Sequence, residues 1–170
     1  MARYSLNWTT ITPTATGDST ADLVDSTYPF LLQGGNTTMR INVNEIYIGG
    51  EAPSASSPTI MKFARSAQVA TGTIGAGTCR NALIDGSATA PGTIALFGHT
   101  AATNKPRRST TLHLLNLSFN AFGGIARWQA RFGEELSIVG NAASLGECTL
   151  SAYTGGTPGA MSGHCLYEIA

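Results

Sequence analysis

The residues of this sequence best suited to metal or acid–base chemistry are its three histidines, His99, His113 and His164. A metal site in a β-rich protein needs several ligands converging from adjacent strands, most directly a His-x-His pair with a nearby carboxylate. No such pair occurs, and Cys165, the neighbour of His164, would leave a regular strand on the opposite face. We therefore expect no metal site, and a histidine that is exposed or hydrogen-bonded beside a small buried thiol.

Carboxylates and hydroxyls offer other routes to catalysis. Glu134 and Glu135 are adjacent, but on a strand they would face opposite ways, which favours a solvated turn over a catalytic pair. Residues 159–163 miss the Gly-x-Ser-x-Gly spacing of a nucleophile elbow by one position, and residues 72–77 match neither a P-loop nor a dinucleotide-binding motif. A triad assembled from distant residues stays open. We predict that the chain is not an enzyme and binds no cofactor.

The charge of the chain limits its partners. Ten basic and ten acidic residues cancel, so nothing long-range draws the chain to nucleic acid or to an anionic membrane. The segment Lys105–Arg108 is interpreted as a solvated loop, in which Arg107 and Arg108 are candidates for contacts with a partner. Charged residues are only 12% of the chain, which favours a surface covered by neighbouring subunits over an ordinary β-protein poor in charge.

Cysteine content and hydropathy bear on where the chain is made. Three cysteines, Cys79, Cys148 and Cys165, cannot form a complete set of intramolecular disulfides, which favours synthesis in a reducing cytoplasm. The N-terminal residues 1–10 carry no apolar run of signal-peptide length, and no segment approaches the roughly 20 apolar residues of a membrane span. We expect a protein that is made in soluble form.

One all-β domain is expected, divided into an N-terminal arm with the first strand or strands (1–38) and a body (39–170). The arm contains a possible strand at Tyr4–Thr10 and an apolar strand or anchor at Tyr28–Leu32. The body begins where apolar and polar residues alternate from Met39 to Asn44, as in a half-buried strand. Because the alternation slips before Ile46, we expect a β-bulge at Asn44–Glu45, or else a strand buried on both faces.

Further strands are expected in the remainder of the body, whereas Gly72–Arg80 is too rich in glycine for a strand interior. Trp128 is expected in the core, on one face with Ala126, Ala130 and Phe132. Many short strands with glycine-rich turns predict a β-sandwich, jelly-roll-like in its connections. The expected strands are Thr59–Thr71, Thr93–Phe97, Leu112–Phe119, Ile125–Phe132, Glu134–Gly140, Gly146–Tyr153 and Ala160–Ile169.

Three stretches of the sequence resemble tailed-bacteriophage capsid decoration (cement) proteins of the β-sandwich type. They are the opening Ala2–Thr10, the strand Arg40–Gly49, and Arg127-Trp128 leading into Phe132–Leu136, with a similar ending at Tyr167-Glu168. The resemblance implies a virion protein on the outer surface of an assembled head. It would strengthen contacts of the major capsid protein, often as a homotrimer, after synthesis in the host cytoplasm.

Two roles for the arm and two other functions are weighed against this resemblance. Tyr4, Leu6 and Trp8 are candidates for contacts with a neighbouring subunit, because aromatic residues in a polar segment make favourable anchors; alternatively, Trp8 covers the protein's own core. In the first case, deleting the first ten residues should leave the body folded.

The other functions are a different virion component (tail, baseplate or head fibre) and a carbohydrate-binding module. The module would use exposed tyrosines, for which the candidates are Tyr47, Tyr153 and Tyr167.

Overall fold

A computed structural model describes residues 2–12, 30–33, 40–56, 58–68, 80–84, 95–96, 106–139, 147–154 and 156–170. These residues form strands and turns and contain no helix, which confirms the all-β prediction for this part of the chain. They therefore contain no helix with the length and hydropathy to cross a membrane. The strands are β1 (Ala2–Ile11), β2 (Phe30–Gln33), β3 (Arg40–Gly50), β4 (Pro58–Gln68), β5 (Arg80–Leu83), β6 (Ala95–Leu96), β7 (Pro106–Asn120), β8 (Ile125–Gln129), β9 (Leu136–Val139), β10 (Glu147–Thr154) and β11 (Met161–Ile169).

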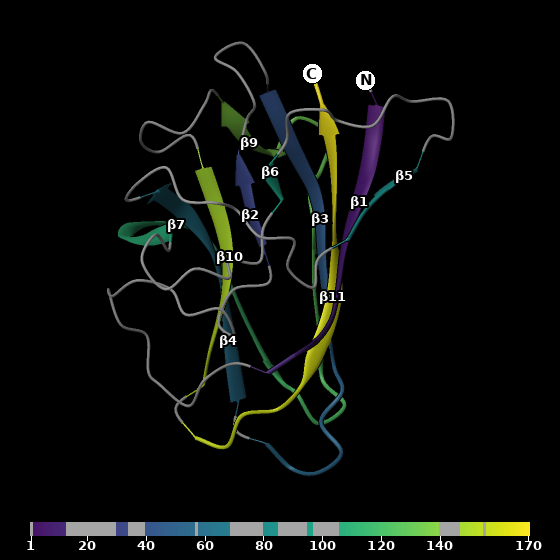
Figure 1. Cartoon of the computed structure of the whole chain (residues 1–170), viewed down its shortest axis with the longest axis vertical. Helices are drawn as coiled ribbons and strands as arrows, with labels where there is room; N and C mark the ends of the chain where they lie inside the picture. The colour runs from purple at the N-terminus through teal and green to yellow at the C-terminus, as the bar shows by residue number, and fades with distance from the viewer. Residues whose placement is uncertain are drawn as a thin grey trace.

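The strands form two antiparallel sheets (Figure 1). Sheet A has the order β5-β1-β11-β3-β8, and β9 pairs with β3 beyond the end of β8. Sheet B has the order β6-β2-β10-β4-β7. Both chain ends lie in sheet A, where Ala2 is opposite Ile169 on the neighbouring strand. Strands from the two ends of the sequence are thus central to one sheet.

The two sheets contribute side chains to one hydrophobic core. Alternate residues of β1, β3 and β11 point inward from sheet A, and Met61, Phe63 and Phe119 meet them from sheet B. Tyr4 and Tyr167 are opposite each other in register, and their rings stack at a centroid distance of 5.3 Å. The period-two alternation that indicated strands therefore also sorts the side chains between core and surface.

A β-bulge interrupts β3, as the sequence predicted. Leu166 of β11 is opposite Glu45 and Tyr167 is opposite Val43, so Asn44 has no partner on β11. The extra residue keeps Val43 and Ile46 both in the core although they are three positions apart. Glu45 then lies on the opposite face from these two aliphatic side chains.

The N-terminal arm is not confirmed by the described residues. Residues 2–11 form β1, which lies between β5 and β11 within sheet A. Residues Tyr4, Leu6 and Trp8 are 3%, 0% and 1% exposed, and they belong to the core of their own chain. The second of the two alternatives for Trp8 is therefore the one observed. Of the remaining arm, Phe30–Gln33 is strand β2, and most of the rest lies outside the described residues.

Most of the expected strands are found, and three details differ. The five strands expected after Leu112 correspond to β7 to β11. Residues 106–108, expected in a loop, belong to β7, whose pairing with β4 extends to Pro106. Arg80, placed at the end of a glycine-rich loop, begins β5 because it pairs with Asn7. Phe132 was expected in the core but is fully exposed, because β8 ends at Gln129 before the alternation can bring it inward.

Candidate functional site

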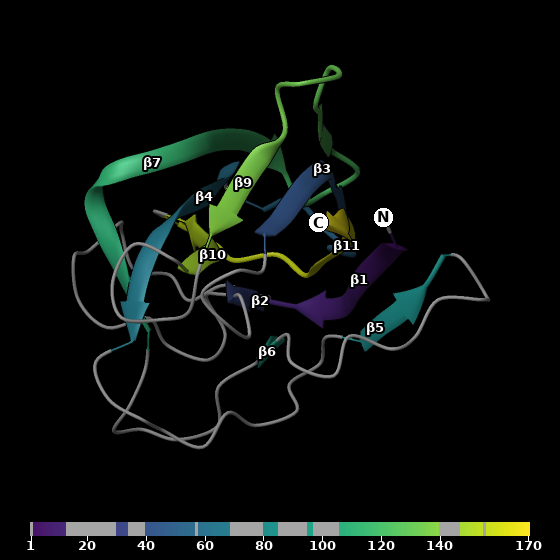
Figure 2. The same cartoon turned by 90° about the horizontal axis from the view of Figure 1, so that it is seen from above.

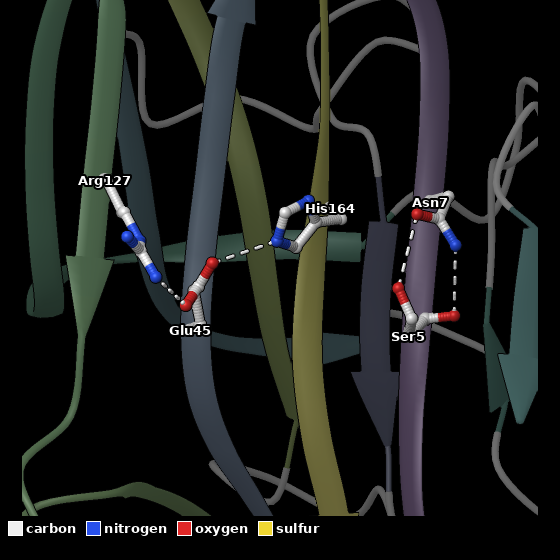
Figure 3. Close-up of polar contacts among 5 residues, drawn as sticks. All are labelled: Ser5, Asn7, Glu45, Arg127 and His164. Carbon is white, nitrogen blue, oxygen red and sulfur yellow. Dashed lines mark hydrogen bonds and ion pairs between the residues drawn. The ribbon is translucent and has the colours of Figure 1, made fainter. Parts of the chain in front are cut away.

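The outer face of sheet A carries a connected group of polar side chains. One row across this face joins four neighbouring strands through Asn7 of β1, His164 of β11, Tyr47 of β3 and Arg127 of β8. Glu45 lies one pleat away on the same face, and its carboxylate reaches back to this row (Figure 3). Four strands therefore position one continuous strip of side chains.

Glu45 is the centre of this strip. Its Oε2 accepts a hydrogen bond from Arg127 Nη2 at 2.7 Å, and its Oε1 lies 3.0 Å from His164 Nε2 (Figure 3). Although it is on the outer face, the residue is only 7% exposed. Burial alone would raise the pKa of the Glu45 carboxyl. The hydrogen bonds and charges of Arg127 and His164 outweigh burial and lower this pKa below its ordinary value.

The neighbours of Glu45 are fixed by further contacts. The Tyr47 and His164 rings stack at a centroid distance of 5.3 Å with an interplanar angle of 12°. On β1, the Ser5 hydroxyl donates to Asn7 Oδ1, and Asn7 Nδ2 donates to the Ser5 carbonyl, both at 3.3 Å (Figure 3). The bond from Glu45 to Arg127 raises the pKa of the guanidinium, which stays a cation. These contacts fix the orientations of the side chains in the strip.

This arrangement does not assemble a hydrolytic triad in the described part of the chain. Since a carboxylate accepts hydrogen bonds, Nε2 of His164 must donate to Glu45, which leaves Nδ1 as the other hydrogen-bonding atom of the ring. No serine or threonine hydroxyl is hydrogen-bonded to His164 there, and the Ser162 hydroxyl donates to Glu51. The residues described also include no group of three or more His, Cys, Asp and Glu that could hold a metal ion. The group is suited to recognition by hydrogen bonds.

Two grooves border the strip. The larger, of about 430 Å³, has Glu45 in its wall, with Arg3, Glu168 and Phe132 around it. The smaller, of about 340 Å³, lies on the other side of the Tyr47–His164 pair and extends to Glu51. Each groove therefore shares one wall with the polar strip.

The loop between β8 and β9 presents an apolar side chain beside the larger groove. Figure 2 shows the connection that leads into β9 projecting from the body of the molecule. Gly133 has a φ of 84°, which glycine adopts without strain, and its N–H donates to Glu135 Oε1 at 3.0 Å. The Glu134 N–H donates to the Arg131 carbonyl at 2.9 Å. This turn holds Phe132 fully exposed.

The residues singled out from sequence lie in different places. Tyr4, Leu6 and Trp8 are core residues, and the backbone of Arg107 and Arg108 is in β7, while their side chains lie outside the described part. Tyr4, Leu6 and Trp8 thus do not contribute to the polar strip. The sequence-based interpretation of His164 as hydrogen-bonded and of Cys165 as a buried thiol is confirmed, as is the turn at Glu134 and Glu135.

The three tyrosines considered for carbohydrate binding also differ in their positions. Tyr167 is fully buried, so its candidacy as an exposed aromatic is wrong; its inward position follows from its opposition to Tyr4. The side chain of Tyr153 lies outside the described part. Tyr47 is half-buried on the outer face and lines the smaller groove.

Sequence reasoning did not single out Glu45 and Arg127 as site residues. The alternation in β8 did assign Arg127 to the face opposite Trp128, and the bulge at Asn44 turns Glu45 to that same face. The register of β3 against β8 and β11 brings these side chains together, and the alternation within each strand does not predict this register. The exposure of Phe132 depends on where β8 ends, a boundary that alternation alone does not define.

Comparison with known proteins gives no relative: the chain matches no protein-family model, and no significant similarity is found to curated proteins or to solved structures.

Proposed function

We propose that this chain is a structural virion protein that binds the outer surface of an assembled bacteriophage head and stabilises contacts between subunits of the major capsid protein. The observation that carries the proposal is the exposed Phe132 on its hydrogen-bonded turn. A large, rigid aromatic side chain that is fully exposed on a fixed turn is a favourable anchor at an interface. We therefore assign the role of interface anchor to Phe132 of the β8–β9 loop in place of the N-terminal segment.

The strand order supports a jelly-roll β-sandwich, the finer fold class within this proposal. Successive strands β1, β2, β3 and β4 alternate between the sheets, and so do β7 and β8, and β9, β10 and β11. The orders β1-β11-β3-β8 and β2-β10-β4-β7 are those expected when two Greek keys wrap around one core. Jelly rolls occur in viral capsid and lectin domains, so the fold is compatible with the proposal by analogy.

Surface character supports a protein partner. Besides Phe132, Ile125 and Phe122 are 64% and 54% exposed, and the net charge of zero provides no long-range attraction to nucleic acid. Several uncovered apolar side chains on a surface poor in charge favour association with other subunits. The proposal places the protein on the virion surface as a homotrimer. Size-exclusion chromatography with light scattering tests this state, and a stable monomer at high concentration would contradict it.

Binding to purified heads that lack this chain tests the function. We expect the wild-type protein to sediment with the heads, and Phe132→Ser to bind about tenfold or more weakly with unchanged thermal stability, as for an interface anchor. Ile60→Ser is the matched control, because it removes an exposed apolar side chain on β4, in the other sheet, and should leave head binding unchanged. Failure of the wild-type protein to bind heads would overturn the proposal. Electron microscopy of the virion separates it from a place in the tail, baseplate or head fibre.

A further inference from the structure

The smaller groove on the outer face of sheet A owes its shape to a missing side chain. Along one row across the sheet, Ser162 of β11 is opposite Gly49 of β3. The next row contains His164 and Tyr47, whose stacked rings form a wall. Because Gly49 has no side chain, the sheet is hollowed beside this wall, and Glu51 closes the other side.

The backbone at the edge of this groove departs from a regular strand. β1 pairs in register up to Trp8 opposite Gly163, and the pairing resumes at Ile11 opposite Met161, so Thr9 and Thr10 share one place in the ladder. Thr10 has a φ of 51°, an uncommon conformation for a residue with a branched side chain. Bulges and strained residues of this kind occur preferentially beside binding sites. Thr9, beside Thr10 in this irregular stretch, lines the groove.

Three polar groups lining the groove have unused hydrogen-bonding capacity among the described residues. Glu51 Oε1 accepts from Ser162, whereas its Oε2 has no partner there. His164 donates through Nε2 to Glu45, which leaves Nδ1 on the other side of the ring for a further hydrogen bond (Figure 3). The Tyr47 hydroxyl has no hydrogen bond in the described part. The groove thus combines a carboxylate acceptor, an imidazole nitrogen, a hydroxyl and an aromatic ring.

We propose that this groove binds a neutral sugar. One hydroxyl of a pyranose ring would donate to Glu51 Oε2, another would form a hydrogen bond with His164 Nδ1, and an apolar C–H group of the sugar would contact the Tyr47 ring, whose Cε1 borders the place where Gly49 lacks a side chain. Such a site has the usual form of small-molecule sites: a concavity with an apolar surface and a few polar groups that fix orientation. The inference does not depend on binding to phage heads, since it rests on a different groove.

The charge of the lining residues and the position of Phe132 argue against other ligands. The carboxylate of Glu51 disfavours an anion, and none of the groove-lining residues is a lysine or arginine. The apolar anchor Phe132 lines the other groove, so a protein segment has less to bind here. An organic ammonium ion is the remaining competitor, because it would also favour a carboxylate beside an aromatic ring.

Saturation-transfer NMR of the full-length protein with glucose, galactose, mannose and N-acetylglucosamine, each at millimolar concentration, tests the proposal. At least one sugar is expected to show transfer, and a glycan array identifies tighter oligosaccharides. Gly49→Val should abolish the transfer by filling the groove. A Cβ at Gly49 meets only Tyr47 Cε1, at 3.9 Å, which is an ordinary van der Waals contact. Glu51→Gln should weaken binding about tenfold or more through loss of a charged acceptor.

Gln129→Ala is the matched control, because Gln129 is exposed on the same face but lines the larger groove. It should bind the sugar as the wild type does. Absence of binding to every sugar and to the array, equal binding by Gly49→Val, or binding of choline in place of sugars would each overturn the proposal. Head binding by Gly49→Val should equal that of the wild type, so loss of sugar binding and loss of capsid binding are distinguished.

Discussion

The Ala130 N–H donates a hydrogen bond of 2.8 Å to the carbonyl of Asn44, the residue that forms the bulge in β3. This bond lies at the point where β3 changes partners, from Gln129 of β8 opposite Glu45 to Leu136 of β9 opposite Val43. The loop that carries Phe132 leaves the sheet between these two strands. The bulge therefore connects the core alternation of β3 with the position of the exposed loop.

Deleting Asn44 should leave the core intact and release the loop. Without this residue, Val43, Glu45 and Ile46 would alternate regularly, so Val43 and Ile46 would still face the core. The Ala130 amide would lose its acceptor, and we expect its hydrogen exchange to become faster by about tenfold or more. Exchange measured by NMR, with the Ile48 amide as internal reference, checks this. An unfolded variant or an unchanged Ala130 amide would contradict the inferred role of the bulge.

Glu45 should make stability depend on pH in the acid range. Its pKa is lower in the folded protein than the ordinary value of 4.5, so the unfolded chain binds the proton more readily. The contribution of this carboxylate is therefore complete above the unfolded-state pKa and is lost as the pH falls through the folded-state pKa. Urea denaturation at a series of pH values should show a smaller acid loss of stability for Glu45→Gln than for the wild type. Glu134→Gln, at an exposed carboxylate of the β8–β9 loop, is the control.

Removing the first ten residues should unfold the protein, contrary to what an independent arm would allow. β1 lies between β5 and β11 and contributes Tyr4, Leu6 and Trp8 to the core. Trp8→Ala alone should lower the free energy of unfolding by about 3–5 kcal/mol, the usual cost of truncating a buried tryptophan. Chemical denaturation measures this loss. Thr9→Ala, at the exposed neighbouring position, should stay within about 0.5 kcal/mol of the wild type, and a folded truncated chain would restore the arm hypothesis.

Local patterns predicted the strands and the bulge because both follow from which face of a strand is apolar. The slip between Val43 and Ile46 is visible in the sequence itself. The same patterns could not assign Trp8 to its own core, because an aromatic residue in a polar segment serves equally well inside a fold or at an interface. That choice depends on strand pairing between residues at opposite ends of the chain, such as Trp8 and Gly163. The Glu45–His164–Arg127 contacts have the same origin.

Two adjacent glycines of β3 should respond to alanine in opposite ways. A Cβ on Gly50 would overlap the Ala121 carbonyl oxygen, a backbone atom that cannot move aside cheaply, whereas a Cβ on Gly49 would have only an ordinary contact. The tight approach at Gly50 is reinforced by its N–H, which donates to the Gly124 carbonyl at 2.9 Å.

We expect Gly50→Ala to destabilise the protein by about 1–3 kcal/mol through overpacking. Gly49→Ala should stabilise it by about 0.4–1 kcal/mol, because the unfolded chain loses conformational freedom. Urea denaturation of the two variants, compared with the wild type under the same conditions, measures both changes. Shifts of the same sign would show that the packing of β3 against the turn at Ala121 is looser than these distances require.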